Sequence, residues 1–272
     1  MKTILITGTT SGIGHVSALE LAKAGHKIVM ANRNRAKSEA LRDELIAQTG
    51  NNNIELLDLD LSSLDSVREC AQAFLATNDK LDILLNNAGL TSQTEVITKD
   101  GYELQFAVNA LAQFLFTREL LPALEAASPS QVIFVTSMMH KFGKLNFDSF
   151  KGWEKYSGGA SYNQSKLAMM LLARELAERC KDKQIAVNTL HPGAVNTGIL
   201  DSYSKFAQFF LRKMFISPEK GAITSLHLAG LDAGSMPTGK YFSSAKEAAA
   251  NKLIEDVALR KKLWDTCTEY VV

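Results

Sequence analysis

The sequence predicts a doubly wound α/β fold, with one parallel sheet of about seven strands flanked by helices. Short apolar runs alternate with longer amphipathic stretches along the whole chain, as expected of buried strands joined by helices. A glycine-rich loop, TGTTSGIG, separates the first apolar run from the first amphipathic stretch. In such folds the crossovers are right-handed, and ligands bind beyond the carboxyl ends of the strands. The residues that follow each strand are therefore the candidates for a functional site.

Apolar runs rich in Ile, Leu and Val predict the strands. Runs of this kind are typical of parallel strands that are buried on both faces. The last run is the shortest, and it predicts a short strand at the edge of the sheet. The predicted strands are Thr3–Thr7, Lys27–Ala31, Ile54–Leu59, Leu81–Leu85, Gln131–Thr136, Ile185–Leu190 and Lys240–Phe242.

Amphipathic spacing and end signals predict the helices. Gly25 is placed to end the first helix, Ser62 or Ser63 to begin the third, and Pro122 to follow the fourth. The predicted helices are His15–Ala24, Lys37–Thr49, Ser62 or Ser63 to about Ala76, Tyr102–Leu121, Ser161–Arg179, Pro218–Leu231 and Lys246–Thr268.

Composition fits a single globular domain over residues 1–272. Hydrophobic residues make up 46% and charged residues 22% of the chain, with no repeat, low-complexity tract or Pro/Ser-rich linker. The net charge of +1 gives no indication of a nucleic-acid partner. The 3 cysteines are far apart and form no Cys/His cluster, so neither a metal site nor a disulfide framework is expected.

The sequence carries no signal for export or membrane insertion. It begins directly with a predicted strand, without the basic and apolar regions of a signal peptide. No apolar run approaches the ~20 residues that a spanning helix needs. Reduced thiols are the simplest interpretation of the cysteines, so we expect a cytoplasmic protein.

The loop after the first strand predicts a phosphate site. Gly8, Gly12 and Gly14 let the backbone turn tightly and let phosphate oxygens approach it closely. The helix that follows offers free N–H groups and the positive end of its dipole. The spacing is not the usual GxGxxG, and an ordinary βα turn is the alternative. The strand–loop–helix context favours the phosphate site.

The second strand is followed by Asn32-Arg33-Asn34-Arg35, which contains no acid. Enzymes that use NAD place a carboxylate near this point to accept the ribose hydroxyls. A carboxylate repels a 2′-phosphate, whereas a guanidinium such as that of Arg33 binds it in a bidentate manner. The segment therefore favours NADP(H), with a solvated basic loop as the alternative.

The next two strands are also followed by polar residues. Asp60 is placed to accept a hydrogen bond from an adenine amino group, or to act as a charge at a helix N-terminus. After the fourth strand, Asn87, Ala88 and Gly89 suit a tight loop lying against a ribose. The same residues also suit an ordinary turn.

Tyr162 and Lys166 are four residues apart on a predicted helix, so they share one face. A neighbouring ammonium stabilises a phenolate and lowers the phenol pKa from about 10, which makes the phenol a usable acid or base. Ser137 ends the fifth strand and is placed to polarise a substrate oxygen. Alone, the Tyr/Lys pair resembles a surface pair. The glycine loop and Ser137 favour a catalytic pair.

Together these residues resemble the classical short-chain dehydrogenase/reductase family, which has a Rossmann-like fold. They occur in the family's order, span nearly the whole chain and include the family's own glycine spacing. The residues that carry the resemblance are Thr7-Gly8-x-x-x-Gly12-Ile13-Gly14, Asn86-Asn87-Ala88-Gly89, Asn109, Ser137, Tyr162-x-x-x-Lys166 and Pro192-Gly193.

The resemblance implies a catalytic tetrad and an NADP(H) site. Tyr162 would exchange a proton with the substrate oxygen, and Ser137 would orient that oxygen. Lys166 would bind the nicotinamide ribose and lower the pKa of Tyr162, and Asn109 would hold a water that links Lys166 to a proton relay. The expected cofactor contacts are Gly8, Ser11, Gly12, Ile13, Gly14, Arg33, Asp60, Leu61, Asn87, Ala88, Gly89, Tyr162, Lys166, Pro192, Gly193, Val195 and Thr197.

A narrower resemblance is to the retinol-dehydrogenase-like branch of the family. That branch includes reductases of bulky apolar carbonyls, and many animal members have an N-terminal membrane segment that this sequence does not show. Thr9 and Thr10 stand where relatives often have an asparagine, and we expect this departure to be tolerated. The resemblance rests on Asn32-Arg33-Asn34-x-x-Lys37, Leu190-His191-Pro192-Gly193, the long insert between Ser137 and Tyr162, and Leu263-Trp264-Asp265.

Two segments are predicted to form the substrate side. Residues 198–218 are rich in Phe and are predicted to form a lid. A basic amphipathic helix on a membrane surface and a helix packed on the protein core are the alternatives. The insert Met138–Gly159 adds apolar side chains, and His140 either lines the pocket or is a simple loop histidine. The candidate substrate contacts are Met138, His140, Trp153, Phe206 and Phe210.

The leading hypothesis is an NADP(H)-dependent oxidoreductase of a hydrophobic aldehyde, ketone or alcohol, with Tyr162 as general acid/base. A membrane-peripheral reductase of a retinoid or lipid is a variant of it. The alternative is a non-catalytic NADP(H)-binding sensor or scaffold, which would have no need of Tyr162 and Ser137. A small hydrophobic substrate is the expected partner, and weak membrane-surface contact and homo-oligomer formation stay open.

Overall fold

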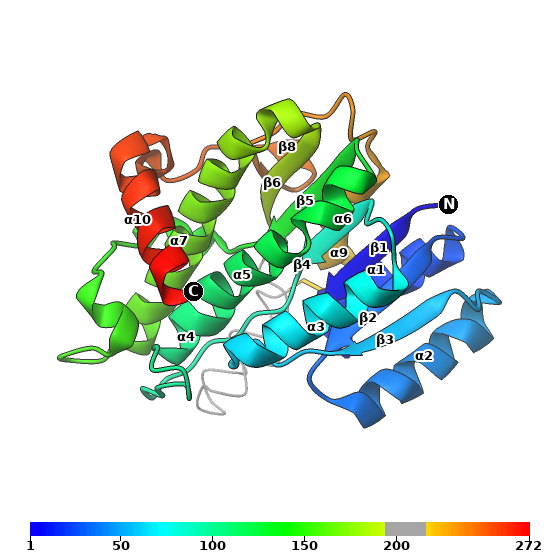
Figure 1. The fold of residues 1–272 in the computed structure, drawn as a ribbon, viewed down its shortest axis with the longest axis horizontal. Helices are drawn as coiled ribbons and strands as arrows, with labels where there is room; N and C mark the ends of the chain where they lie inside the picture. The colour runs from blue at the N-terminus through cyan, green and yellow to red at the C-terminus, as the bar shows by residue number, and fades with distance from the viewer. Residues whose placement is uncertain (194–215) are drawn as a thin grey trace.

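The structure is a computed structural model of the chain that describes residues 1–193 and 216–272. Within these residues, the centre is one sheet of eight strands in the order β3-β2-β1-β4-β5-β6-β7-β8 (Figure 1). All pairs from β3 to β7 are parallel, and β8 runs antiparallel to β7. The strands are β1 (Thr3–Thr7), β2 (Lys27–Asn32), β3 (Ile54–Asp58), β4 (Ile83–Asn86), β5 (Ser130–Val135), β6 (Ile185–His191), β7 (Tyr241–Ser243) and β8 (Lys246–Glu247).

Helices connect the parallel strands and lie on both faces of the sheet (Figure 1). No helix within the described ranges is long and apolar enough to cross a bilayer. The α-helices are α1 (Gly12–Lys23), α2 (Arg35–Thr49), α3 (Leu64–Thr77), α4 (Leu104–Phe106), α5 (Ala112–Glu119), α6 (Leu121–Ala126), α7 (Gly158–Arg179), α9 (Pro218–Gly230) and α10 (Val257–Tyr270). The shorter turns are the π-helical η1 (Ala107–Leu111) and the 3-10 turns η2 (Met138–Phe142), η3 (Asp148–Lys151), η4 (Lys181–Lys183) and η6 (Lys252–Glu255).

Successive side chains of each strand enter two separate cores, because strand side chains alternate between the faces of a sheet. Leu5 and Leu84 pack in the core that α3, α5, α7 and α10 cover. Ile4 and Ile83, the preceding residues, pack in the core beneath α1, α2 and α9. The continuous apolar strands of the sequence follow from this double burial.

The predicted doubly wound fold and the seven parallel strands are confirmed, with strand ends shifted by at most two residues. Two helix predictions are wrong. The predicted helix Tyr102–Leu121 is interrupted by the π-helical η1, and Pro122 lies in the first turn of α6 rather than beyond a helix end. The predicted helix Lys246–Thr268 begins instead with β8, and its regular part is α10.

The parallel register brings the predicted site residues to one edge of the sheet. Thr7 at the end of β1 pairs with Ala31, next to the end of β2. Phe134 of β5 pairs with Asn86 of β4 on one side and with Thr189 of β6 on the other. The segments that follow these strands therefore start side by side, as the carboxyl ends of parallel strands must.

Candidate active site

The glycine loop after β1 is fixed by the end of β2. Asn32 is buried, and its Oδ1 accepts the Thr9 backbone N–H at 2.7 Å. Its Nδ2 donates to Thr9 Oγ1 at 2.8 Å. This two-point contact holds the middle of the loop in one conformation and gives the hydroxyl of Thr9 a structural role.

The glycines of this loop create a close approach that larger residues would block. Gly8 and Gly12 have φ angles of +71° and +59°, in the left-handed region that favours glycine. A Cβ on Gly8 would lie 2.9 Å from the Cβ of Ala88, and a Cβ on Gly14 would collide with the Gly8 carbonyl oxygen. Ser11 begins α1 without a side-chain cap, so no capping side chain occupies the first-turn N–H groups. This cradle fits a phosphate group.

The loop after β4 is bonded directly to the glycine loop. Thr7 Oγ1 accepts the backbone N–H groups of Asn87 and Ala88, each at 3.0 Å. Asn87 Nδ2 donates to the carbonyl oxygens of Thr7 and Gly8 at 2.9 and 3.0 Å. Three of the predicted cofactor residues, Gly8, Asn87 and Ala88, thus belong to one rigid unit.

Two arginines that follow β2 differ in their partners. Arg35 lies 3.0 Å from Glu39 and 3.6 Å from Asp58, and these carboxylates raise its pKa, mainly through the Glu39 hydrogen bond. Arg33 is exposed and makes no ion pair within the described part of the chain. Of the two, Arg33 is therefore the guanidinium available to an anionic ligand.

Asp60 forms a turn ahead of α3. Its Oδ1 accepts the backbone N–H of Ser62 at 2.9 Å and the Ser62 hydroxyl at 2.7 Å. The α3 cap itself is Ser63, whose hydroxyl accepts the Ser66 N–H. Leu61 is buried in the core. Cofactor contacts from Asp60 and Leu61 stay predictions.

Asn109 is held in the middle of the π-helical η1, where the backbone departs from regular α-helix. Its Oδ1 accepts the Leu90 N–H and its Nδ2 donates to the Leu90 carbonyl, both at 2.9 Å. The same Nδ2 lies 3.0 Å from the hydroxyl of Ser165 on α7. Single π-helical turns occur frequently at functional sites. Here the turn carries a predicted tetrad residue.

Lys166 is buried, with 4% of its surface exposed, and burial lowers its pKa to about 8. Its Nζ donates to the Val135 carbonyl at 3.3 Å and lies 5.8 Å from the centre of the Tyr162 ring. No carboxylate lies within ion-pair distance of Lys166 in the part of the chain that the structure describes. The ammonium is therefore held beside Tyr162 without a neutralising charge.

Gly89 brings the loop after β4 against two residues of the predicted tetrad. A Cβ at Gly89 would lie 3.0 Å from Asn109 Oδ1 and 3.2 Å from Lys166 Nζ. The absence of a side chain at this position allows the loop after β4 to lie directly against both groups. The fold thus gathers the glycine loop, a buried ammonium and a phenol at the carboxyl edge of the sheet.

The sequence profile of the short chain dehydrogenase family matches residues 2–208 of the chain. The chain belongs to this family. It is 38% identical to human retinol dehydrogenase 13 over 97% of this chain and 82% of that protein. It is 35% identical to human retinol dehydrogenase 14 over 97% of this chain and 84% of that protein. The predicted family and its retinol-dehydrogenase-like branch are confirmed.

Solved structures agree with this assignment. A protein of Mycobacterium paratuberculosis without an assigned function superposes with a TM-score of 0.80 at 28% identity, covering 100% of this chain and 93% of that one. An NADP complex of RhlG from Pseudomonas aeruginosa superposes with a TM-score of 0.73 at 25% identity, covering 89% of this chain and 94% of that one. The protein is thus a short-chain oxidoreductase of CH–OH and C=O groups.

In this short chain dehydrogenase, Ser137 follows β5 and begins η2. Its hydroxyl accepts the Met139 N–H at 3.3 Å. Its carbonyl oxygen lies 2.6 Å from His140 Nδ1, so that nitrogen must carry the hydrogen. His191 Nδ1 accepts the Met138 N–H at 3.2 Å, and burial lowers the pKa of His191 to about 4. Two neutral imidazoles therefore support the Ser137 turn.

The predicted place of His140 in the substrate pocket needs correction. Its side chain is fully buried, and its ring packs edge-on to Tyr241 at 4.8 Å. Burial also lowers the pKa of His140, which keeps the imidazole neutral. His140 lies beneath Ser137 and has no surface from which to contact a substrate.

Other predicted substrate contacts are only partly described. Met138 is 47% exposed next to Ser137. Trp153 is half-buried, and its backbone N–H donates to Glu95 Oε1 at 2.6 Å. Pro192 and Gly193 follow β6, and Gly193 has a φ of +93°. Val195, Thr197, Phe206, Phe210 and most of the predicted lid, 198–218, lie outside the described residues.

No structural role was predicted from the sequence for the residues that hold this site in place. Asn32 and Thr7 connect the loops after β1, β2 and β4. The Ser165 hydroxyl accepts a hydrogen bond from the Asn109 side-chain amide and donates one to the Tyr162 carbonyl at 2.8 Å. A small polar residue at the end of a buried strand was the available signal for Asn32 and Thr7. Ser165 had none, because its partner is far away in the sequence.

Proposed function

We propose that the protein transfers hydride between NADP(H) and a hydrophobic aldehyde, ketone or alcohol, with Tyr162 as the general acid/base. The observation that carries this proposal is the buried Lys166 ammonium beside Tyr162. A buried cation stabilises an adjacent phenolate, which makes proton exchange by the phenol easier near neutral pH. In the reducing direction, the substrate oxygen takes its proton from the Tyr162 hydroxyl. The Ser137 hydroxyl holds the same oxygen by a hydrogen bond.

The glycine loop and α1 would hold the cofactor pyrophosphate, and Arg33 would hold a 2′-phosphate. The uncapped first turn of α1 and the close packing of Gly8 on Ala88 support the first contact. The exposed guanidinium of Arg33, without an ion pair in the described ranges, supports the second. The NADP complex of RhlG agrees with this choice. When bound, the cofactor supplies the hydride.

A hydrophobic substrate is supported by the surface next to Ser137. Met138 is 47% exposed and Phe142 is 66% exposed, on the turn that carries the serine. Large apolar side chains at such positions suit an apolar ligand. The chain is similar to human retinol dehydrogenases 13 and 14, so retinaldehyde and retinol are the first compounds to test.

We also propose a cytoplasmic location, which the free, buried cysteines Cys70, Cys180 and Cys267 support. Weak contact with a membrane surface and homo-oligomer formation stay predictions. Liposome sedimentation and analytical ultracentrifugation of the purified protein test them separately.

The proposed function is tested by NADPH oxidation with retinaldehyde and a panel of apolar aldehydes and ketones. We expect turnover by the wild type and a loss of about 10²- to 10⁴-fold in Tyr162→Phe, the usual contribution of a general acid. Cofactor titration of the same variant should show that NADPH still binds. Full activity of Tyr162→Phe would remove the mechanism. Tight NADPH binding with no turnover on any compound would favour the non-catalytic alternative.

A further inference from the structure

We propose that Glu103 is a positioning residue that sets the relation between the two helical segments of the active site. This inference rests on the proposed function, because it concerns the placement of Tyr162 and Asn109. The Glu103 side chain is fully buried, and no Lys, Arg or His pairs with it in the described part of the chain. A buried carboxylate without a cation needs several hydrogen-bond donors.

Three donors from two helical segments meet this carboxylate. Its Oε1 accepts the Gln105 backbone N–H at 3.0 Å, and its Oε2 accepts the Phe106 N–H at 2.9 Å. These bonds begin the α4–η1–α5 segment, which carries Asn109. The third donor is the hydroxyl of Ser161 on α7, 2.8 Å from Oε2. Ser161 is buried and directly precedes Tyr162.

The backbone of Glu103 also bonds to the insert Met138–Gly159, which is predicted to contact the substrate. Its N–H donates to the carbonyl of Phe150 in the insert at 2.9 Å. Its carbonyl accepts the Ala107 N–H at 2.8 Å, at the start of η1. One residue thus joins the insert, the π-helical turn and the catalytic helix.

A second bond between the segments lies one helical turn further along α7. Asn109 Nδ2 lies 3.0 Å from Ser165 Oγ, which in turn donates to the Tyr162 carbonyl. Ser161 and Ser165 are four residues apart, so they share a face of α7. The two serines bracket Tyr162 in sequence, and both bonds contribute to the height and the rotation of α7 at that residue.

The chemistry of the junction favours a carboxylate over an amide. All three partners donate hydrogens, and an ionised carboxylate only accepts them. A glutamine at this position would turn one N–H group towards a donor. The backbone N–H groups and the Ser161 hydroxyl would then compete for a single oxygen.

The sharpest test removes the Glu103–Ser161 contact and leaves the helix start and the Asn109–Ser165 bond intact. Ser161→Ala deletes only the hydroxyl, whereas Glu103 still accepts the Gln105 and Phe106 N–H groups. We expect kcat to fall roughly tenfold, about the effect of one lost hydrogen bond. The Kd of NADPH should stay within twofold of wild type, and Ser161→Thr, which restores a hydroxyl, should recover most of kcat.

The matched control is Ser157→Ala. Ser157 begins α7, and its hydroxyl accepts the Ala160 N–H. This variant should lower the melting temperature without changing kcat at 25 °C. A similar loss of kcat in both variants would mean that general weakening of α7 is the cause, and it would overturn the positioning role.

Hydrogen exchange gives a readout that does not depend on activity. In Ser161→Ala, exchange should rise in residues 104–111 as well as at the start of α7, whereas Ser157→Ala should affect α7 alone. Unchanged exchange in 104–111 with kcat within twofold of wild type would overturn this inference and leave the proposed function intact. Absence of turnover by wild type would overturn the proposed function and, with it, the positioning role.

Discussion

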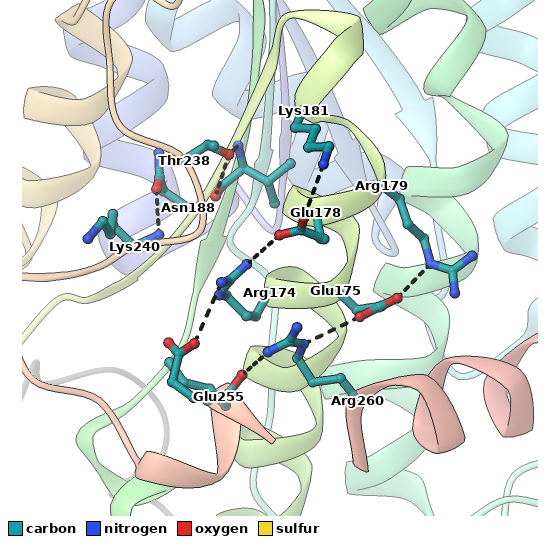
Figure 2. A network of polar contacts seen from close by, with 12 residues as sticks. Arg174, Glu175, Glu178, Arg179, Lys181, Asn188, Thr238, Lys240, Glu255 and Arg260 are labelled. Carbon is teal, nitrogen blue, oxygen red and sulfur yellow. Dashed lines mark hydrogen bonds and ion pairs between the residues drawn. The ribbon is translucent and has the colours of Figure 1, made fainter. Parts of the chain in front are cut away.

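The two halves of α7 hold buried charges in opposite ways. Lys166, in the first half of the helix, is buried beside Tyr162 without a carboxylate in ion-pair contact among the described residues. Glu175, nine residues later, is equally buried but contacts two arginines, Arg179 at 2.9 Å and Arg260 at 3.3 Å (Figure 2). The helix therefore carries one unneutralised buried charge and one neutralised buried charge.

The neutralised charge is part of a network that attaches the C-terminal region to α7. Arg260 of α10 also donates to the Ile254 carbonyl of η6 at 2.7 Å. On a neighbouring side of α7, Arg174 contacts Glu178 at 3.4 Å and Glu255 at 3.6 Å (Figure 2). These contacts act on packing, and none of them reaches Tyr162.

We propose that this difference separates a catalytic charge from a structural charge within one helix. A buried charge with partners holds segments together. The net contribution of such an ion pair to stability is small compared with the free-energy cost of removing one partner. A buried charge without a counter-ion costs stability and persists where the chemistry uses it. We propose that Lys166 fits the second description, and substitutions at Lys166 and at the partners of Glu175 distinguish the two cases.

Lys166→Met is expected to reduce kcat/KM for the carbonyl substrate by about 10³-fold, because the phenolate of Tyr162 loses its stabilising cation. The melting temperature should stay the same or rise, since the variant removes an uncompensated buried charge. Steady-state kinetics and thermal denaturation measure the two effects. If Lys166→Met kept its activity but melted at a lower temperature, the role of Lys166 would be structural, like that of Glu175.

Arg260→Met is expected to lower stability and leave activity unchanged, the opposite of Lys166→Met. It leaves the buried Glu175 with only the half-exposed Arg179, and breaking a buried pair from one side costs about 3–5 kcal/mol. Urea denaturation measures this loss, and kcat at 25 °C should remain near the wild-type value. The double variant Glu175→Leu/Arg260→Met should recover most of the stability, because no uncompensated charge remains. A loss of kcat in the folded single variant would contradict the separation.

The lowered pKa of Lys166 predicts how stability depends on pH. In the unfolded chain this lysine titrates near 10.5, and in the folded chain near 8. Between these values the unfolded state binds more protons, so the contribution of Lys166 to stability rises with pH. The stability advantage of Lys166→Met over wild type should therefore be full below pH 8 and disappear as pH approaches 10.5. If the stability difference between Lys166→Met and wild type did not change with pH, the pKa of Lys166 would not be lowered in the folded protein.

The two arginines that follow β2 also differ in whether they have a carboxylate partner among the described residues. Arg33→Ala should raise the KM for NADPH roughly tenfold and leave the KM for NADH nearly unchanged, because it removes a charge-assisted contact with the 2′-phosphate. Arg35→Ala is the control, since Arg35 already contacts Glu39 and Asp58. Its effect should be small and equal for both cofactors. An equal loss for both cofactors in Arg33→Ala would remove the basis of the NADP preference.

The sequence was sufficient for the parallel sheet because its signals are local and repeated. Strands such as Thr3–Thr7 are apolar throughout, and the residues after them stand out as small or polar. The short β8 carries no such signal, because both of its residues are exposed and Ser244 and Ala245, which precede it, adopt positive φ without being glycine. Its antiparallel hairpin follows from pairing with β7 rather than from local preference.

Some residues of the candidate site also have a local sequence signal, and others do not. Gly8, Ser137, Tyr162 and Lys166 stand out in the sequence because each belongs to a short motif at a strand end or on one helix face, and their roles stay predictions. Glu103 could not, because its decisive partner, Ser161, lies 58 residues away in the sequence. The interrupted helix around Asn109 was also missed, since the contacts of its side chain with Leu90 are tertiary.

Direct titration of the Lys166 ammonium shows whether its buried charge is uncompensated in the folded protein. Lysine side chains labelled at Cε can be followed by NMR as pH is raised, and Lys166→Met identifies the resonance that belongs to Lys166. We expect this resonance to titrate near pH 8, whereas exposed lysines titrate near 10.4. A midpoint above 10 for Lys166 would mean that its charge is compensated in the folded protein, and the contrast between the two halves of α7 would be wrong.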